Sequence, residues 1–355
     1  MWAAGVNTFG QLGIHGHNGE IQKYFVKVLF GGAQAVAAGG EHSIVLTEVG
    51  TVWATGSNVY GQLGDMSNIA TDSFVQVVIA SGQAVAAGGK HSMVIIRGGS
   101  VWTAGCNSHG QLGDGSTTDR NKFLRVKFAH GKVTAIAAGS AHSMVVMKDG
   151  SLWTAGSNEY GQLGTGVELL ETSFVRVMPT GAKAIAAGSY HSMVMKRDGS
   201  VWVAGFNAFG QLGDGSINSK SSFVKVIPSG AKSIAAGYHH SMVMKNYGSI
   251  WAAGSNNFGQ LGPGPSVLSN TFVPVLSGGA FMIAAGDWHS VMLKRDGTLW
   301  VTGSNLYGQL GDGSTMSTKV WTQVFVSHGG ACRGALFSRA MSIYAIVPFS
   351  MNYEM

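Results

Sequence analysis

Six histidines recur along the chain, each followed directly by a serine, and these two residue types are common in metal sites and in nucleophilic catalysis. The histidines are His42, His91, His142, His191, His240 and His289, spaced 49 or 51 residues apart. With one histidine per repeat, the six rings cannot converge on one ion at the ~2 Å that ligation requires. Successive side chains of a strand point to opposite faces, so a His and the Ser after it do not form a dyad. We predict no metal site, no cofactor and no catalytic residue, and expect each His to hold its own loop by hydrogen bonds.

Seven glycine-rich segments of the form G-x-N-x-x-GQLG resemble loops that wrap a phosphate. They start at Gly5, Gly56, Gly105, Gly156, Gly205, Gly254 and Gly303. None carries the Lys-Ser/Thr pair of a P-loop, or the strand, helix and distal acid of a dinucleotide fingerprint. Seven evenly spaced copies indicate a repeated unit of architecture instead. We expect each segment to be a structural latch, in which glycines take positive φ values and the Asn side chain satisfies backbone amides.

The repeat itself contains four short runs typical of strands. The unit from Ala184 to Ile227 divides into AIAAG, HSMVMKRDG, SVWVAG and FVKVI, bounded by Gly, Asp and Ser. Asp-Gly pairs between the second and third runs suit tight hairpin turns. Seven tryptophans mark the third run, and we expect them to pack in the core: Trp2, Trp53, Trp102, Trp153, Trp202, Trp251 and Trp300. A period near 50 residues with four strands predicts the blade of an all-β propeller.

Side-chain size predicts the order of the strands from the axis outward. The AIAAG-type run has the smallest residues and suits the crowded hub. The F-V-x-V run carries Lys, Arg, Gln or Pro at its variable position, as expected of an unpaired edge. Pro274 would remove a ladder hydrogen bond from an interior strand, which favours the rim. In an antiparallel meander, the loops between strands one and two and between strands three and four then open on the same face.

Composition is consistent with one body rather than several. The chain has 355 residues, of which 11% are charged, with 54 Gly, 6 Pro and 2 Cys. We predict a single propeller domain over residues 1–355. No apolar run is long enough to span a bilayer, no secretion signal is visible, and Cys106 and Cys332 cannot form a disulfide framework. We expect an intracellular protein, cytoplasmic or nuclear, without excluding an organelle.

The net charge is +6, and one cluster of basic residues stands out. It comprises Arg120, Lys122, Arg125, Lys127 and Lys132. Such a cluster is a candidate patch for an acidic partner, although most such clusters are solvated faces. We do not expect nucleic-acid binding.

The combination of AAG-x-x-HS, DG-x-V/L-W and G-x-N-x-x-GQLG resembles the regulator of chromosome condensation repeat. The resemblance extends from Trp2 to about Val326 and implies a seven-bladed propeller of four-stranded antiparallel blades. It also implies closure by pairing of C-terminal strands with the N-terminal strand. The segment 334–355 departs from the pattern, because it reads GALFSRAMSIYAIVPF where AIAAG-x-x-HS is expected. Within this degenerate closing segment, Met341 to Val347 is the candidate strand.

The two variable positions before each His lie at the mouth of the predicted channel. They provide aromatic side chains beside a few charges, the mixture found at recognition surfaces. The candidate partner-binding residues are Glu41, Lys90, Tyr190, Tyr238, His239, Asp287 and Trp288. The alternative, that these are merely tolerant loop positions, stays open.

Two functions compete. The first is a noncatalytic scaffold or adaptor that holds a protein partner on its loop face, either as a monomer or as a subunit of a larger complex. The second, implied by the resemblance, is a guanine-nucleotide exchange factor for a Ras-like small GTPase. In the family this activity depends on an inserted wedge and on acidic residues. Here the units are uniform in length and only Glu41 and Asp287 provide acid at the mouth, so the scaffold is favoured. The plant ultraviolet-B photoreceptor has the same fold, but its G-W-R-H pattern is missing.

Overall fold

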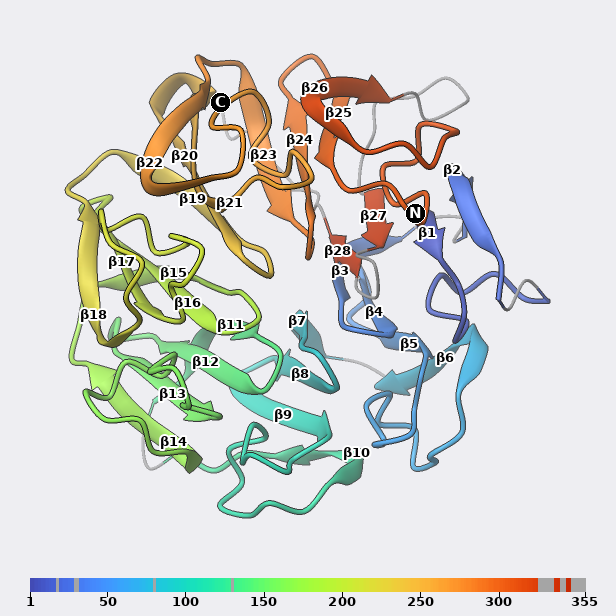
Figure 1. Cartoon of the computed structure of the whole chain (residues 1–355). Coiled ribbons are helices and arrows are strands. Elements are labelled where there is room, and N and C mark those ends of the chain that lie inside the picture. The colour runs from blue at the N-terminus through green and yellow to red at the C-terminus, as the bar shows by residue number, and fades with distance from the viewer. Residues whose placement is uncertain are drawn as a thin grey trace, which may run out of the picture.

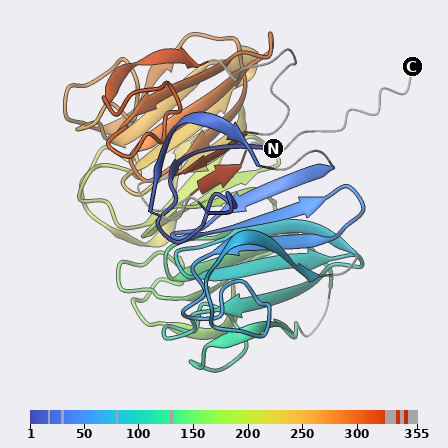
Figure 2. The same ribbon diagram turned by 90° about the vertical axis from the view of Figure 1, so that its right-hand side faces the viewer.

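The computed structural model describes residues 1–16, 19–28, 32–78, 81–128, 131–324, 335–338 and 343–345. Its regular elements are 28 strands and one short 3-10 helix, η1 (Asn246–Gly248). Six blades are each built from four consecutive antiparallel strands and stand around a common centre (Figure 1). In the edge-on view, long connecting loops project from the left-hand side of the ring (Figure 2). No helix within the described residues is long and apolar enough to cross a membrane.

The strands of each blade are given in order from the inner to the outer edge. Blade 1 contains β3 (Ala33–Ala38), β4 (His42–Thr47), β5 (Val52–Gly56) and β6 (Thr71–Val78). Blade 2 contains β7 (Gly82–Ala87), β8 (His91–Ile96), β9 (Ser100–Gly105) and β10 (Arg120–Arg125). Blade 3 contains β11 (Val133–Ala138), β12 (His142–Met147), β13 (Leu152–Gly156) and β14 (Glu171–Met178).

The second half of the chain repeats this arrangement. Blade 4 contains β15 (Ala182–Ala187), β16 (His191–Lys196), β17 (Val201–Gly205) and β18 (Lys220–Ile227). Blade 5 contains β19 (Ala231–Ala236), β20 (His240–Lys245), β21 (Ile250–Ser255) and β22 (Leu268–Leu276). Blade 6 contains β23 (Ala280–Ala285), β24 (His289–Lys294), β25 (Leu299–Gly303) and β26 (Thr318–Val324).

The expected count of seven antiparallel blades is wrong, because the structure has six blades of that kind. The remaining sheet, which we call the closing sheet, has the order β2-β1-β27-β28. It joins β1 (Trp2–Val6) and β2 (Ile21–Lys27) to the short strands β27 (Ala335–Ser338) and β28 (Ile343–Ala345). β27 runs parallel to β1, with Trp2 opposite Ala335, so the antiparallel order of the blades is broken.

The reason for this correction lies in the sequence of the closing segment. An antiparallel blade needs a small-residue inner strand followed by the His-Ser strand, and the segment has no AAG-x-x-HS pattern to form them. Of the candidate strand Met341 to Val347, only residues 343–345 form β28, and the rest lies outside the described residues.

The predicted radial order of the strands is confirmed. β10, β14 and β18 lie at the periphery and β7 and β11 nearer the centre (Figure 1). The backbone is crowded at the hub: a Cβ on Gly39 would lie 2.5 Å from the carbonyl oxygen of Gly88 in the next blade. Only small residues allow this approach. At the rim, Pro274 lies in the outer strand β22, opposite Trp251.

Inside each GQLG segment, one asparagine holds the loop together, as predicted. Asn207 Oδ1 accepts a hydrogen bond from the backbone N–H of Leu212 at 2.9 Å. Its amide nitrogen donates to Asp214 Oδ1 at 3.1 Å and to the Ser216 carbonyl oxygen at 3.1 Å. The bond to the leucine N–H recurs in all seven segments. Backbone groups of the loop are therefore satisfied from within the loop by the asparagine side chain.

Each GQLG segment also contacts the outer strand of the next blade. The last glycine lies against an aromatic ring of that strand, and we call this contact the inter-blade latch. Gly213 has φ +67°, and a Cβ there would lie 2.5 Å from the Phe272 ring. The seven latches are Gly13–Phe74, Gly64–Phe123, Gly113–Phe174, Gly164–Phe223, Gly213–Phe272, Gly262–Trp321 and Gly311–Phe25. The last of these joins blade 6 to β2, so the N-terminal hairpin contacts both of its neighbours.

The hydrophobic core is divided among the gaps between adjacent sheets. In one cluster, Met193 and Val203 of blade 4 pack with Val243 and Phe272 of blade 5. The strand-three tryptophans lie half-buried at the outer side of these cores. Trp202 donates its indole N–H to Ser200 Oγ at 3.1 Å, and Lys196 Nζ lies 4.2 Å from the ring centroid. Each blade is therefore stabilised by the next one.

We predict that Gly213→Ala destabilises the protein more than Gly215→Ala, a matched change in the same loop. Both residues have positive φ, but a Cβ on Gly215 meets nothing within 4 Å. Both variants carry the cost of a left-handed alanine, about 1–2 kcal/mol. Gly213→Ala adds overpacking against Phe272, worth about 1–3 kcal/mol. Urea unfolding measures the difference, and equal losses for the two variants would contradict the latch.

Candidate functional site

Five of the six repeat histidines are linked to the serines of the neighbouring blades. His42 Nε2 lies 2.9 Å from Ser92 Oγ, and both residues are fully buried. The same bond joins His91 to Ser143, His142 to Ser192, His191 to Ser241 and His240 to Ser290, at 2.8 or 2.9 Å. Sequence reasoning expected each His to serve its own loop and missed this link. The sequence feature that could have indicated this link is the constant spacing of the His-Ser pairs from one repeat to the next.

The proton positions follow from the serine. Ser241 Oγ donates its only hydrogen to the carbonyl oxygen of Gln211 at 2.7 Å, since a carbonyl can only accept. It must then accept from His191, which carries its proton on Nε2. Because His191 Nε2 already carries a proton, it cannot act as a base toward Ser241. The pair is therefore a structural link between blades and not a nucleophile with its base.

Burial keeps these imidazoles neutral. Desolvation lowers the pKa of His42, His91 and His191 to about 3 and that of His142 to about 4. Since each ring is completely removed from water, the charged form loses its hydration. Among the described residues, no three His, Cys, Asp or Glu side chains gather in a group that could hold a metal.

The backbone N–H of the first variable position in blades 1 to 5 donates to a carbonyl of the next blade at the channel mouth. The Gly89 N–H donates to the Gly139 carbonyl at 3.0 Å, and the Tyr238 N–H donates to the Asp287 carbonyl at 3.2 Å. These bonds connect adjacent blades, so the loops that carry the candidate residues hold one another in place.

Four of the seven candidate partner-binding residues line one cavity of about 640 Å³ at this mouth: Glu41, Lys90, Tyr238 and Asp287. Lys90 is exposed, and its Nζ lies 3.3 Å from the Tyr60 hydroxyl and 4.7 Å from the Tyr60 ring centroid. Asp287 is only 8% exposed. The cavity thus combines carboxylates, an ammonium group and aromatic edges.

The other three candidates, Tyr190, His239 and Trp288, lie in an adjacent cluster of rings, and Tyr238 belongs to both groups. Tyr238 stacks on Trp288 at 5.2 Å between centroids and meets Tyr190 edge-on at 5.6 Å. His239 stacks on Phe209 at 4.1 Å, and burial lowers its pKa to about 4. The cluster has eight members, which we call the mouth cluster: Tyr160, Tyr190, Phe206, Phe209, Tyr238, His239, Phe258 and Trp288.

Half of the mouth cluster was missed from the sequence. Tyr160, Phe206, Phe209 and Phe258 come from the GQLG segments and not from the residues before His. The residue before GQLG is Phe or Tyr in six of the seven repeats, for example Tyr60 and Tyr307, and this pattern was a usable signal. Cys106 was also missed; it is a free, buried thiol that lines the cavity.

The five basic residues proposed as an acidic-partner patch do not form one compact site. Arg120 is paired with Asp114 at 2.9 Å. Arg120, Lys122 and Arg125 lie along β10, followed by Lys127, and a strand advances about 3.3 Å per residue. Lys132 lies at the other end of the blade, where its carbonyl oxygen accepts from the Lys148 N–H. The charges extend from the rim strand β10 of blade 2 to the start of the inner strand β11 of blade 3.

The repeated blades, joined by the inter-blade latches, define the protein as a β-propeller built from sequence repeats. Its loops form one rigid face around the mouth. The chain belongs to the RCC1-like domain family, whose model matches residues 1–337. Human WBSCR16 superposes with a TM-score of 0.84 at 19% identity, over 99% of this chain and 98% of that chain. Yeast RCC1 (Prp20) bound to Kap60 gives 0.84 at 21%, over 98% and 88%. At such identities these likenesses show the fold alone.

A second structure of yeast Prp20 and a bovine relative are also similar to this chain. Prp20p from Saccharomyces cerevisiae, described with its binding properties to Gsp1p and histones, gives a TM-score of 0.83 at 22% identity over 98% of this chain and 91% of that chain. The secretion-regulating guanine nucleotide exchange factor of Bos taurus is 48% identical over 67 residues. That match spans 18% of this chain and 14% of the relative's length.

We predict a loss of stability on mild acidification. The buried histidines have pKa values near 3–4 in the folded state, against an unfolded value of about 6.5. Their contribution to the free energy of unfolding is fully present above pH 6.5 and is lost as the pH falls toward 4. The reason is that the unfolded chain binds protons that the folded protein excludes. Unfolding at pH 5 should take up roughly four protons, and each lowers the free energy of unfolding by about 1.4 kcal/mol per pH unit.

Urea unfolding between pH 7 and 4 measures this slope. The control variant His109→Asn changes an exposed histidine outside this buried set and should leave the slope unaltered. A free energy of unfolding that stays constant until carboxylates protonate below about pH 4 would contradict neutral buried histidines.

Proposed function

We propose that the protein is a noncatalytic scaffold that binds a protein partner on its loop face. The observation that carries this proposal is the mouth cluster, a continuous set of aromatic rings contributed by blades 3 to 6. Seven of its eight rings are only half-buried. Clusters of Tyr, Trp and Phe beside a few charged groups are typical of the central residues of protein interfaces.

Apolar side chains around the cluster support the same proposal. Leu169 is 69% exposed, Leu170 50% and Ile217 57%, and all three lie in the loops that follow the GQLG segments. These loops open on the face that carries the mouth cluster. Exposed apolar groups gathered near an aromatic centre are characteristic of an interaction site.

The hydrogen bonds inside the GQLG segments favour binding by a preorganised surface. Tyr160 and Phe209 directly precede glycines whose segments are held by Asn158 and Asn207. Loops fixed in this way lose little conformational entropy when a partner docks. We further propose that the cavity with Glu41, Lys90 and Asp287 provides polar contacts at one edge of the interface, in the cytoplasm or the nucleus.

The experiment compares partners purified with the wild-type protein and with the double variant Tyr190→Ser/Trp288→Ser. We expect at least one partner to be lost, because two aromatic contacts of about 2 kcal/mol or more each are removed. The matched control is Tyr24→Ser, which removes a 67% exposed aromatic residue from the rim strand β2. A partner set identical in all three samples would place the site elsewhere, and near-ultraviolet circular dichroism verifies folding.

Guanine-nucleotide exchange is the second candidate function, favoured by the local similarity to the bovine exchange factor. The carboxylates of Glu41 and Asp287 at the cavity are the acidic groups that the mouth would offer to a small GTPase. A nucleotide-release assay against a panel of Ras-like GTPases tests it. On the scaffold proposal, release stays at the intrinsic rate. Acceleration by the wild type that is lost in Glu41→Gln/Asp287→Asn would establish exchange instead.

A further inference from the structure

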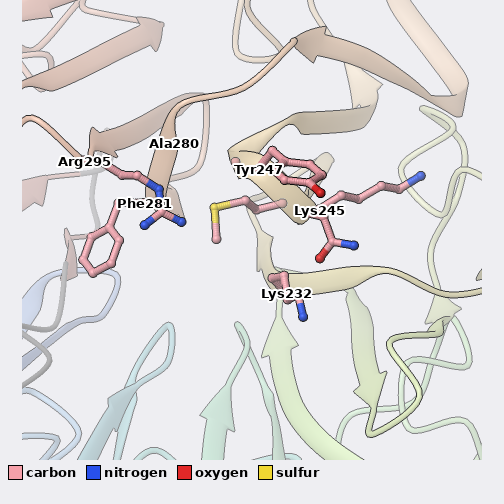
Figure 3. Close-up of a pocket in the computed structure, with 9 residues that line it drawn as sticks. Lys232, Lys245, Tyr247, Ala280, Phe281 and Arg295 are labelled. Atoms are coloured by element: carbon pink, nitrogen blue, oxygen red, sulfur yellow. The ribbon is translucent and has the colours of Figure 1, made fainter. Parts of the chain in front are cut away.

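A second cavity, of about 560 Å³, opens between blades 5 and 6 on the face opposite the mouth cluster. Blade 5 contributes Lys232 from β19, Lys245 from the end of β20 and Tyr247 from η1. Blade 6 contributes Phe281 from β23 and Arg295 from the turn after β24. Arg295 and Tyr247 lie on opposite sides of the opening (Figure 3). We call this cavity the basic groove.

The basic groove has three cationic residues, and no acidic residue lines it. Within the described residues, Lys232, Lys245 and Arg295 take part in no ion pair. The nearest acid in sequence, Asp296, accepts from the N–H and hydroxyl of Thr298 at 2.9 and 2.6 Å. Lys245 Nζ lies 3.8 Å from the Trp251 centroid, and partial burial lowers its pKa. No carboxylate lines the groove, and Arg295 lies 5.9 Å from the Phe281 ring centroid.

Tyr247 distinguishes this groove from its counterparts. The same turn position holds Asp149, Asp198 and Asp296 in three other blades. The equivalent groove between blades 4 and 5 has Lys183 and Lys196, but also the carboxylate of Asp198. Here the acid is replaced by a tyrosine that is 90% exposed and has φ 59°. An exposed aromatic residue in the left-handed region gains nothing from burial, and such outliers cluster at functional positions.

We propose that the basic groove binds a phosphate monoester carried on an aromatic or apolar group. Arg295 can donate to phosphate through two parallel hydrogen bonds, and Lys232 adds a second positive charge to the groove. Lys245 extends away from Arg295, with its ammonium group over the Trp251 ring (Figure 3). Tyr247 and Phe281 offer apolar surfaces for the group that carries the phosphate. The site lies on the opposite face from the mouth cluster, so it does not depend on the proposed function.

Calorimetric titration with phenyl phosphate tests the proposal on the full chain. We expect saturable binding that weakens about tenfold or more in Arg295→Gln and in Lys232→Gln, because each removes a charged contact with the phosphate. The matched control Lys183→Gln, in the equivalent groove, should bind as the wild type does. Absence of saturable binding at millimolar phenyl phosphate, or wild-type affinity in Arg295→Gln, would overturn the proposal.

Two Tyr247 variants separate charge from ring contact. Tyr247→Asp restores the residue of the other blades and should weaken phenyl phosphate and inorganic phosphate alike. Tyr247→Asn keeps a residue that tolerates positive φ, and should weaken phenyl phosphate while leaving inorganic phosphate unchanged. If both variants bound phenyl phosphate as tightly as the wild type does, binding in this groove would be contradicted.

The source of the phosphate is distinguished by comparing the free ester with a phosphotyrosine peptide. Tighter binding of the peptide supports a phosphorylated partner protein, and equal binding supports a small-molecule ester. A DNA duplex that displaces the ester at lower concentration than either would overturn the proposal in favour of nucleic acid.

Discussion

The structure depends on one steric constraint, the approach of a glycine in one blade to an aromatic ring in the next. A side chain at Gly213 would overlap the ring of Phe272, and the same contact recurs around the molecule. It fixes the spacing of adjacent sheets, and the cores between them fill with residues such as Met193 and Val243. The buried His–Ser bonds add a second connection nearer the axis. Together they hold the outer and inner parts of neighbouring blades in register.

This constraint explains how one chain can present two different surfaces. The latch residues and the His–Ser bonds use the constant part of each repeat and leave the positions between them free to vary. On the loop face the variable positions provide Tyr190, Tyr238 and Trp288. On the opposite face they provide Tyr247, where three other blades carry an aspartate. Function is thus placed on the variable positions of a scaffold whose geometry does not depend on them.

The sequence predicts what is encoded within one repeat. Strand order, the Asn–Leu bond of the loop and Pro274 at the rim follow from local patterns, and the structure has them. It does not predict the parallel pairing of β27 with β1, because the closing segment lacks the local pattern. The sequence also does not predict which residues of adjacent repeats are in contact. Whether His191 contacts Ser241, or Phe209 contacts His239, depends on the angle between adjacent blades. No sequence pattern within a single repeat specifies that angle. Arg120 and Lys132 were grouped by sequence proximity, but a strand separates them.

The N-terminal hairpin β1–β2 has a consequence for biosynthesis. Its loop contacts blade 1 through Gly13 and Phe74, so one side can be covered soon after it leaves the ribosome. Its other side needs Gly311, which is translated five blades later than Phe74. Until then Phe25 and the open strand edge remain available to other nascent chains, a hazard of large β topologies that fold vectorially. The ring therefore cannot close before the repeat that carries Gly311 has been synthesised, and the N-terminal hairpin stays uncovered on that side for all of this time.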